Sequence, residues 1–283
     1  IVDLNSTLGD LCKLNKSAAI CDDSSISQSS VLGDLFASYD TVSEAGKAQE
    51  LAQAMRGYDQ FNWGYDPQHF NVPEGSYASN PEGVTRIKEM RAMNQALHEL
   101  GLRVALDVVY NHTNASELNG KSVLDKVVPG YYHRYETDSG SIVRETCCDD
   151  TEPRNVMMEK LMKDSLVLWT TQYKFDSFRF DIMSQASKDS MVDLFEAVKM
   201  YDEDTYFYGE GWTRTDRGYE QANQPNMAGT EIGTFNDRIR EAVRQGQIFS
   251  QNTSDGALAA QDRVKMSLAG TLTNFVLEDF NGV

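Results

Sequence analysis

The sequence predicts an α/β fold with a parallel sheet, and a (β/α)8 barrel in particular. Helical patterns alternate with short strand patterns three times between residues 80 and 210, as in successive βα units. No glycine-rich phosphate loop follows a predicted strand, which weakens the alternative of a doubly wound dinucleotide-binding sheet. Polar residues cluster where the predicted strands end, and barrel enzymes carry their chemistry at that end.

The net charge of the chain limits the kinds of molecule that it can bind. The 283 residues include 26 Lys and Arg against 43 Asp and Glu, a net charge of −17. Such a surface repels phosphate backbones and anionic lipid, so we expect no nucleic acid or membrane partner. No apolar run reaches the roughly 18 residues that span a bilayer. A neutral substrate or a bound cation fits better, and the pattern predicts no oligomeric state.

Residues 1–57 are polar, and "DDSSISQSS" (22–30) predicts a long loop with one helical patch near "KAQELAQAM". Cys12 and Cys21 in this segment favour a loop disulfide and an exported protein over two reduced cysteines. Cys147 and Cys148 are adjacent. They could form a strained disulfide or remain free thiols, and the sequence does not decide between the two. No zinc-ligand spacing occurs, so we predict no metal site. The chain opens without a signal peptide, and both ends look cut from something longer.

The predicted barrel occupies residues 58–283, and its regular part begins near residue 80. Asn80 and Pro81 indicate a helix start, and Gly101 can end that helix. Its apolar positions recur at helical spacing: Ile87, Met90, Met93, Leu97 and Leu100. "LRVALDVVY" (102–110) then predicts a strand buried on both faces. A long loop follows over residues 111–150.

Two further helix–strand units complete the pattern. A helix over residues 152–173 precedes the strand "FDSFRFD" (175–181), and a helix over 187–201 precedes "DTYFYGE" (204–210). "GTFNDRIREAVRQG" (233–246) begins another unit. The repetition favours a parallel sheet with helices between its strands.

The strand ends carry two carboxylates on one predicted face. Side chains alternate along a strand, so Arg179 and Asp181 share a face opposite Phe178 and Phe180. Glu210 ends the next predicted strand. Neighbouring parallel strands lie about 4.8 Å apart, close to the roughly 5–5.5 Å between the carboxyl groups of a retaining glycosidase. A plain Arg–Asp salt bridge is the alternative, and the polar residues at three strand ends favour a site.

The surroundings of the two acids predict different roles. Arg179 favours the ionised form of Asp181, which therefore suits a nucleophile. Glu210 lies among Tyr206, Tyr208 and Trp212, a less polar surrounding that favours the protonated form of an acid/base. Aromatic side chains that could stack on sugar rings, or simply pack in the structure, are Trp63, Tyr65 and Trp212.

Four motifs carry a resemblance to a known family. "DVVYNHT" (107–113), "FRFD" (178–181) and "YGEGW" (208–212) resemble conserved blocks of the α-amylase superfamily of glycoside hydrolases. "FNWGYDP" (61–67) resembles the signature of type I pullulanases and limit dextrinases, with Phe61 where the family usually has Tyr. "VPEGSYASNPEG", "SVLDKVVPGYYHR" and "TCCDD" follow in the order typical of that family. The resemblance covers roughly residues 50–283.

The resemblance implies retaining hydrolysis of α-1,6-glucosidic branch linkages in pullulan, starch or glycogen limit dextrins. It implies that Asp181 is the nucleophile, Glu210 the acid/base, and Arg179 the arginine that contacts the nucleophile. The implied substrate-binding residues are His112 and Tyr65 at the sugar beside the cleaved bond, Trp212 on the leaving-group side, and Trp63 and Asp66 in the signature. Asp107 and Asn111 are implied to be structural. No cofactor is required, and a structural calcium ion at Asn111 stays open.

Two departures from the family pattern limit the expectation. Ser184 and Gln185 replace residues that the family usually has after the second block. The family also uses a third carboxylate in a His-Asp pair near strand seven, and no such pair follows Glu210 here. We therefore expect a barrel that is incomplete, from about the end of strand 1 through strand or helix 6. The third acid would lie beyond Val283, so this polypeptide alone should be inactive and, with open sheet edges, poorly soluble.

Three other functions stay as alternatives. One is an isoamylase-like or α-1,4-acting relative, against which "FNWGYDP" argues. Another is a starch- or glycogen-binding barrel without turnover. A barrel enzyme acting on sugar phosphates is disfavoured, because no basic or glycine-rich phosphate loop is present. An extracellular or cell-surface location is expected.

Overall fold

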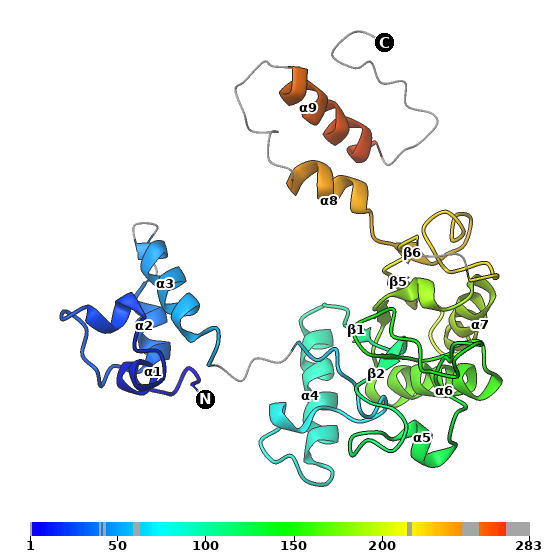
Figure 1. Cartoon of the computed structure of the whole chain (residues 1–283), viewed down its shortest axis with the longest axis horizontal. Coiled ribbons are helices and arrows are strands. Elements are labelled where there is room, and N and C mark those ends of the chain that lie inside the picture. Colours follow the sequence, from blue (N-terminus) through cyan, green and yellow to red (C-terminus); the bar gives the residue numbers. More distant parts are fainter. Residues whose placement is uncertain are drawn as a thin grey trace. The chain divides into compact units, whose positions relative to one another are not determined.

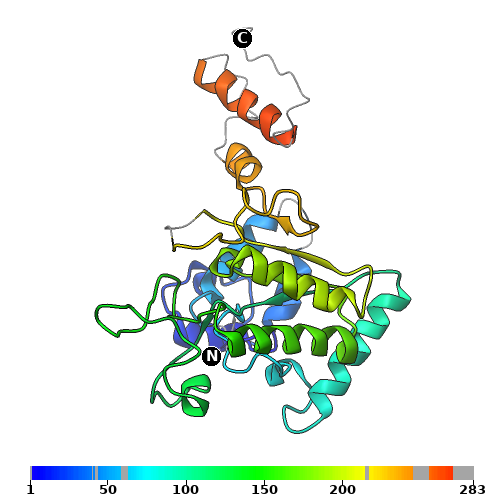
Figure 2. The same cartoon turned by 90° about the vertical axis from the view of Figure 1, so that its right-hand side faces the viewer.

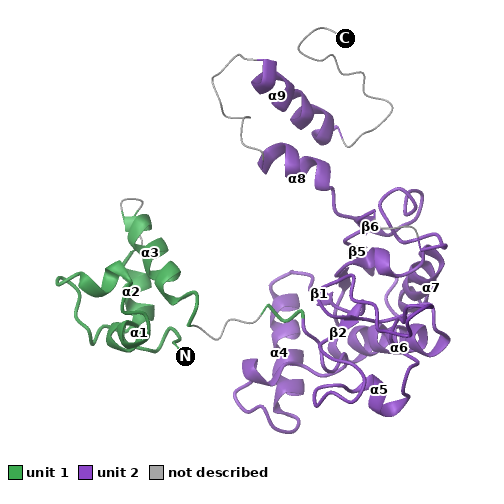
Figure 3. Cartoon of the chain, in the orientation of Figure 1, with its two compact units in different colours: residues 1–65 green, residues 66–283 purple. Residues whose placement is uncertain are grey.

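The computed structural model describes residues 2–39, 41, 44–58, 63–213, 217–244 and 255–269. Two compact units make up the chain, Ile1–Tyr65 and Asp66–Val283 (Figures 1 and 3). This division lies between residues 65 and 66, whereas the sequence predicted a domain boundary between residues 57 and 58. The predicted boundary stays a prediction. Within the described ranges, the helices are too short or too polar to cross a bilayer.

The first unit is helical where the sequence predicted a loop. It contains α1 (Leu8–Leu14), η1 (Ala19–Asp22), α2 (Leu32–Ser38) and α3 (Ala45–Met55). Only α3, near "KAQELAQAM", was predicted. The loop prediction for the other segments is wrong because each short helix buries only one or two apolar side chains, too few to reveal a period. The predicted Cys12–Cys21 disulfide is present and joins α1 to η1.

The second unit alternates helices with short strands. Its first half contains η3 (Gly75–Tyr77), α4 (Thr85–Glu99), β1 (Ala105–Val108), β2 (His112–Thr113), α5 (Leu124–Val127), β3 (Asp149–Asp150) and α6 (Val156–Tyr173). Its second half contains β4 (Ser177–Phe180), η4 (Met183–Gln185), α7 (Lys188–Lys199), β5 (Tyr206–Gly209), β6 (Gly233–Thr234), α8 (Asp237–Arg244) and α9 (Asp255–Leu268).

Four strands form a parallel sheet in the order β1-β4-β5-β6. Asp107, Arg179 and Tyr208 are in register across the first three strands, and Val108, Phe180 and Gly209 form the next row. Strands β2 and β3 form a separate antiparallel pair. The parallel sheet with intervening helices confirms the predicted α/β class and is consistent with part of a (β/α)8 barrel.

The apolar face of the sheet packs against helices α6 and α7, which lie side by side (Figure 2). Phe178 and Phe207 are fully buried, and Phe180 is nearly so. The ring centroids of Phe178 and Phe180 lie 5.5 Å and 5.0 Å from the ring centroid of Phe207. The ring centroid of Phe195, on α7, lies 5.3 Å from it. Burying each such ring contributes about 1.5–3 kcal/mol. The prediction that these phenylalanines face the helices is confirmed.

Helix α4 begins later than predicted. Asn80 does not cap it, because its side chain accepts a hydrogen bond from the Glu82 amide and forms a turn instead. Gly101 ends the helix as predicted, with φ +77° and the Leu102 amide bonded to the Leu97 carbonyl. Strand β1 is shorter than the predicted strand. Its second face is not buried, since Ala105 and Asp107 are exposed.

Candidate active site

One guanidinium connects carboxylates from three neighbouring strands. Arg179 on β4 donates from Nη1 to Asp181 Oδ1 at 3.3 Å and from Nη2 to Glu210 Oε1 at 2.5 Å. Its Nη1 also donates to Asp107 Oδ1 on β1 at 2.9 Å. The side chains of Arg179, Asp181 and Glu210 are between 14% and 21% exposed, so the ion pairs are only partly solvated. The structure thus brings the three predicted catalytic residues together, and their roles stay predictions.

The predicted surroundings of Glu210 are wrong. The second carboxylate oxygen of Glu210 accepts a hydrogen bond from the Ile182 amide at 3.1 Å. Together with the Arg179 contact, this makes the surroundings strongly polar. Parity along its own strand suggested aromatic neighbours, but the actual partners are Arg179 of β4 and Ile182, two residues past the end of β4. Arg179 bonds both acids and therefore does not by itself assign their roles.

Main-chain packing fixes the position of Glu210. A Cβ atom at Gly209 would lie 2.7 Å from the Phe180 carbonyl oxygen, so this residue has to be glycine for β5 to approach β4. The Glu210 amide donates to the same carbonyl at 3.0 Å. Ile182 has φ +37°, a strained conformation for a β-branched residue, and this turn directs its amide at Glu210.

Asn111 contacts Asp181, a role that the sequence did not predict. Its amide nitrogen donates to Asp181 Oδ2 at 2.8 Å and to the Asp181 carbonyl oxygen at 2.9 Å. Asn111 is 3% exposed, so both hydrogen bonds are shielded from water. The two-residue period that starts at Asp107 could have found it, because residue 111 has the same parity.

The calcium alternative at Asn111 stays untested. Among the described atoms, Asn111 Oδ1 is buried without a hydrogen-bond partner, as a metal ligand would be. A calcium ion takes six to eight oxygen ligands, and Asn111 supplies one. Its amide nitrogen is already bonded to Asp181. Asn111 Oδ1 alone does not make a calcium site, and calcium binding stays a prediction.

His112 and Asp66 both lie beside adjacent cysteines. His112 on β2 is 2% exposed, and its Nε2 lies 3.6 Å from Cys147 Sγ. Cys148 Sγ lies 3.4 Å from Asp66 Oδ1. Cys147 and Cys148 form a disulfide, which was one of the two predicted alternatives. Nothing in the spacing of these residues revealed that the loop before β3 folds back onto β2.

The aromatic residues predicted to bind sugar belong to different parts of the chain. Trp212 lies under the Arg240 guanidinium of α8, 5.1 Å from its ring centroid. Trp63 and Tyr65 belong to the first compact unit, and Trp63 is 78% exposed. Phe61 of the same motif lies outside the described residues. Sugar binding by these aromatic side chains stays a prediction.

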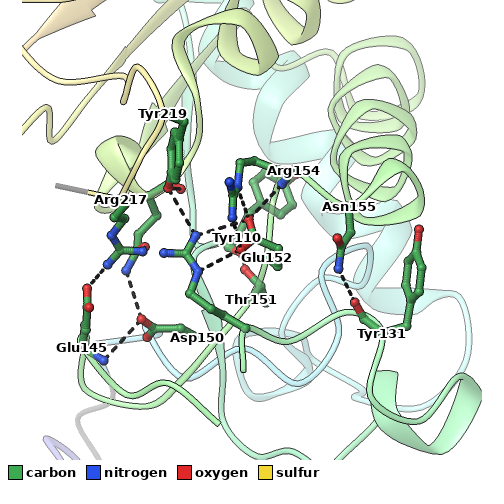
Figure 4. Close-up of polar contacts among 12 residues, drawn as sticks. Tyr110, Tyr131, Glu145, Asp150, Thr151, Glu152, Arg154, Asn155, Arg217 and Tyr219 are labelled. Atoms are coloured by element: carbon green, nitrogen blue, oxygen red, sulfur yellow. Dashed lines mark hydrogen bonds and ion pairs between the residues drawn. The ribbon is translucent and has the colours of Figure 1, made fainter. Parts of the chain in front are cut away.

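A buried polar network anchors the loop that carries the cysteines (Figure 4). The Asp150 carboxylate accepts from the amides of Glu145 and Thr146, from the Thr146 hydroxyl at 2.6 Å and from Gln185 Nε2 at 3.2 Å. Arg217 bonds both Gln185 and Glu145. Gln185 is 1% exposed. This departure from the family pattern therefore holds two loops together.

A second cluster in the same view surrounds Glu152. Its carboxylate accepts from Arg134 Nε at 3.0 Å and from Arg154 Nε at 2.9 Å. Burial raises the pKa of Glu152, but the hydrogen bonds and charges of Arg154 and Arg134 outweigh burial and hold that pKa below its ordinary value. The Tyr219 ring stacks on the Arg154 guanidinium at 4.3 Å, and burial raises the pKa of the Tyr219 hydroxyl. The cluster joins the loop after β5 to the segment after β3 (Figure 4).

Comparison with known proteins finds relatives along the whole chain. It is 41% identical over 315 residues to a pullulanase of Klebsiella pneumoniae, covering 100% of this chain and 28% of the relative. It is 43% identical over 227 residues to the chloroplastic pullulanase 1 of Arabidopsis thaliana, covering 75% of this chain and 23% of the relative. The chain therefore spans about a quarter of the length of these relatives. No protein-family model matches it.

Solved structures agree with the sequence comparison. PulA from Klebsiella oxytoca superposes with a TM-score of 0.79 at 37% identity, covering 100% of this chain and 30% of that structure. A maltotriose complex of PulA from Klebsiella pneumoniae gives 0.78 at 39% identity, covering 100% of this chain and 34% of that structure.

Proposed function

This chain belongs to the type I pullulanases of the α-amylase superfamily, and from that premise we propose that the whole protein hydrolyses α-1,6-glucosidic branch linkages. The substrates are pullulan and the limit dextrins of starch or glycogen. One observation carries the proposal: Asp181 and Glu210 end neighbouring parallel strands and bond the same guanidinium. The strand spacing of about 4.8 Å suits the roughly 5–5.5 Å carboxyl separation of a retaining mechanism.

In the proposed reaction, Asp181 attacks the anomeric carbon and forms a covalent glycosyl ester. Glu210 gives its proton to the departing glycosidic oxygen and then takes one from the water that hydrolyses the ester. Asn111 and Arg179 orient the attacking carboxylate through the contacts at 2.8 Å and 3.3 Å. In the structure each oxygen of Glu210 accepts one hydrogen bond, from Arg179 and from the Ile182 amide.

Neither step needs a cofactor, because two carboxyl groups and water supply the chemistry. We also propose an extracellular or cell-surface location. The Cys12–Cys21 disulfide supports it, since such bonds persist in oxidising compartments. Surface labelling of intact cells that produce the whole protein tests the location, and protection of the protein from the label would contradict it.

Pullulan tests the linkage directly, because its maltotriose units are joined by α-1,6 bonds. The whole protein should release maltotriose as the product, with the newly formed reducing end initially in the α configuration. Panose as the product would instead indicate α-1,4 cleavage. Binding of pullulan without any product, by a protein verified to be folded, would support a binding barrel and overturn the proposed activity.

A further inference from the structure

Four metal-ligating side chains meet beside the candidate active site. One ligand atom from each of Asp66, His112, Cys147 and Cys148 lies within 4.8 Å of the other three. Cys147 Sγ lies 3.6 Å from His112 Nε2, and Cys148 Sγ lies 3.4 Å from Asp66 Oδ1. The two sulfur atoms are bonded to each other and therefore cannot serve as thiolate ligands in this state.

We propose that reduction of the Cys147–Cys148 disulfide creates a zinc site from these four residues. A dithiol reductant supplies two electrons and two protons, the sulfur–sulfur bond breaks, and the reductant forms its own disulfide. Zinc then displaces one proton from each thiol and bonds both thiolates, His112 Nε2 and an Asp66 oxygen. Cys147 is exposed and Cys148 is half-buried, so a reductant can reach the bond.

The donor set selects zinc on chemical grounds. Two thiolates, one imidazole and one carboxylate can surround a metal ion tetrahedrally. This ligand set binds zinc in preference to calcium or magnesium. Two thiolates on one zinc ion lie roughly 3.7 Å apart, as tetrahedral geometry with bonds of about 2.3 Å requires. The nitrogen and oxygen ligands already lie at a similar distance from their sulfur neighbours. The two sulfur atoms have to separate once the bond between them is broken.

Hydrogen bonds that do not involve the disulfide hold the loop that carries the cysteines. Asp150 follows the pair closely and holds the amides of Glu145 and Thr146 ahead of it. Asp150 is also in register with His112 across the β2–β3 pair. Breaking the disulfide therefore leaves Cys147 and Cys148 tethered on both sides, near His112. The ligands are largely preorganised, which favours metal binding.

Zinc in this site would also slow the proposed hydrolysis of pullulan. This part of the inference rests on the proposed function. His112 is the residue that the family resemblance assigns to the sugar beside the cleaved bond. A zinc ion on its Nε2 removes that nitrogen from substrate binding. The reduced, zinc-loaded protein should therefore hydrolyse pullulan more slowly than the oxidised protein.

The test is a metal titration of the whole protein, before and after reduction. A phosphine is the reductant, because it takes the oxygen of one water while the two protons of that water pass to the sulfurs, and it binds zinc weakly. After its removal, zinc is titrated against a chromogenic chelator. We expect one zinc ion per reduced chain, bound roughly 100-fold more tightly than by the oxidised protein. Cobalt in place of zinc should give thiolate-to-metal charge-transfer absorption.

Two variants assign the ligands. The double variant Cys147→Ser, Cys148→Ser should lose the tight site after the same treatment. The matched variant Cys12→Ser, Cys21→Ser also lacks a disulfide and should keep it. Equal zinc affinity of the oxidised and reduced wild-type protein, or tight binding by the Cys147→Ser, Cys148→Ser protein, would overturn the site. The oxidised wild type supplies the comparison even if a variant fails to fold.

Hydrolysis is read separately from binding. Zinc should slow pullulan hydrolysis by the reduced wild type, and a chelator should restore the rate. Tight zinc binding with an unchanged rate would overturn the inhibition and leave the site standing. A protein that never hydrolyses pullulan would overturn the proposed function, while the zinc titration would still decide the site.

Discussion

Arg179 is the residue on which the candidate site is organised. It bonds Asp107, Asp181 and Glu210, so three carboxylates share one guanidinium. The planar guanidinium presents its donors in a fixed fork, which a lysine in its place would lack. Arg179, whose side chain is only 15% exposed, therefore links the two proposed catalytic acids to each other.

At the residue scale, Asp181→Asn should abolish hydrolysis and leave dextrin binding largely intact. Asparagine keeps the shape of the side chain but cannot form the glycosyl ester, so kcat should fall roughly 10⁴-fold or more. The measurement is pullulan turnover together with the dissociation constant for maltotriose. Asp107→Asn is the matched control, since it removes another carboxylate from Arg179 and should lower kcat far less. Turnover by the Asp181→Asn protein close to the wild-type rate would refute the nucleophile assignment.

At the scale of elements, strand parity was the most reliable guide. The alternation in "FRFD" separates the phenylalanines from Arg179 and Asp181, and the structure has this separation on β4. Parity depends only on the geometry of one strand, so a single sequence suffices. It also grouped Asp181 with Glu210, which end adjacent strands.

Other features depended on contacts between distant segments. The β2–β3 pair places His112 beside the cysteines through a long loop whose path no local pattern encodes. The surroundings of Glu210 were misjudged for the same reason, because the amide of Ile182 reaches it across the sheet. Gln185 was noted in the sequence only as a departure from the family pattern, and its buried contacts with Asp150 and Arg217 come from segments distant along the chain.

The Glu152 cluster gives a prediction about two loops. Glu152→Gln removes the charge that Arg134 and Arg154 share, so it should lower the free energy of unfolding at pH 7 by roughly 2–4 kcal/mol. Because the folded-state pKa of Glu152 lies below the ordinary value of 4.5, the stabilisation is present above that value. It is lost as pH falls through the folded-state pKa, where Glu152 takes up a proton.

Thermal unfolding of the whole protein from pH 7 to pH 3 measures this. The midpoint difference between wild type and Glu152→Gln should be largest at neutral pH and shrink below pH 4.5. Glu220→Gln is the control, since it changes an exposed pair with Lys188 in the same region and should have little effect at any pH. A midpoint difference that stays constant with pH would argue against the ionic origin of the stabilisation.

At the scale of the whole molecule, the sheet has open edges within the described residues. Strand β1 and strand β6 lie at the two ends of the order, and no described strand pairs with the outer edge of either. A closed barrel of this class uses eight strands. The sequence also contains no His-Asp pair after Glu210, where the family resemblance places its third acid.

The 283-residue chain by itself should therefore be inactive on pullulan, and it should be prone to aggregate through the outer edges of β1 and β6, with which no described strand pairs. The whole protein, assayed at the same molar concentration, is the positive control. Reducing-sugar release and light scattering measure the two properties. Maltotriose release by the isolated chain at the rate of the whole protein would show that it needs neither further strands nor a third acid.

The glycines on either side of Glu210 have a consequence for how this protein can be altered. A Cβ at Gly209 would strike the Phe180 carbonyl, and one at Gly211 would lie 2.9 Å from the Gln224 amide nitrogen. Close backbone packing on both sides thus fixes the main chain that carries Glu210. Surface segments around the candidate active site could be exchanged between relatives while Glu210, the proposed proton donor, stays in place. Grafted rims with unchanged turnover but a new preference for branch length would demonstrate this tolerance.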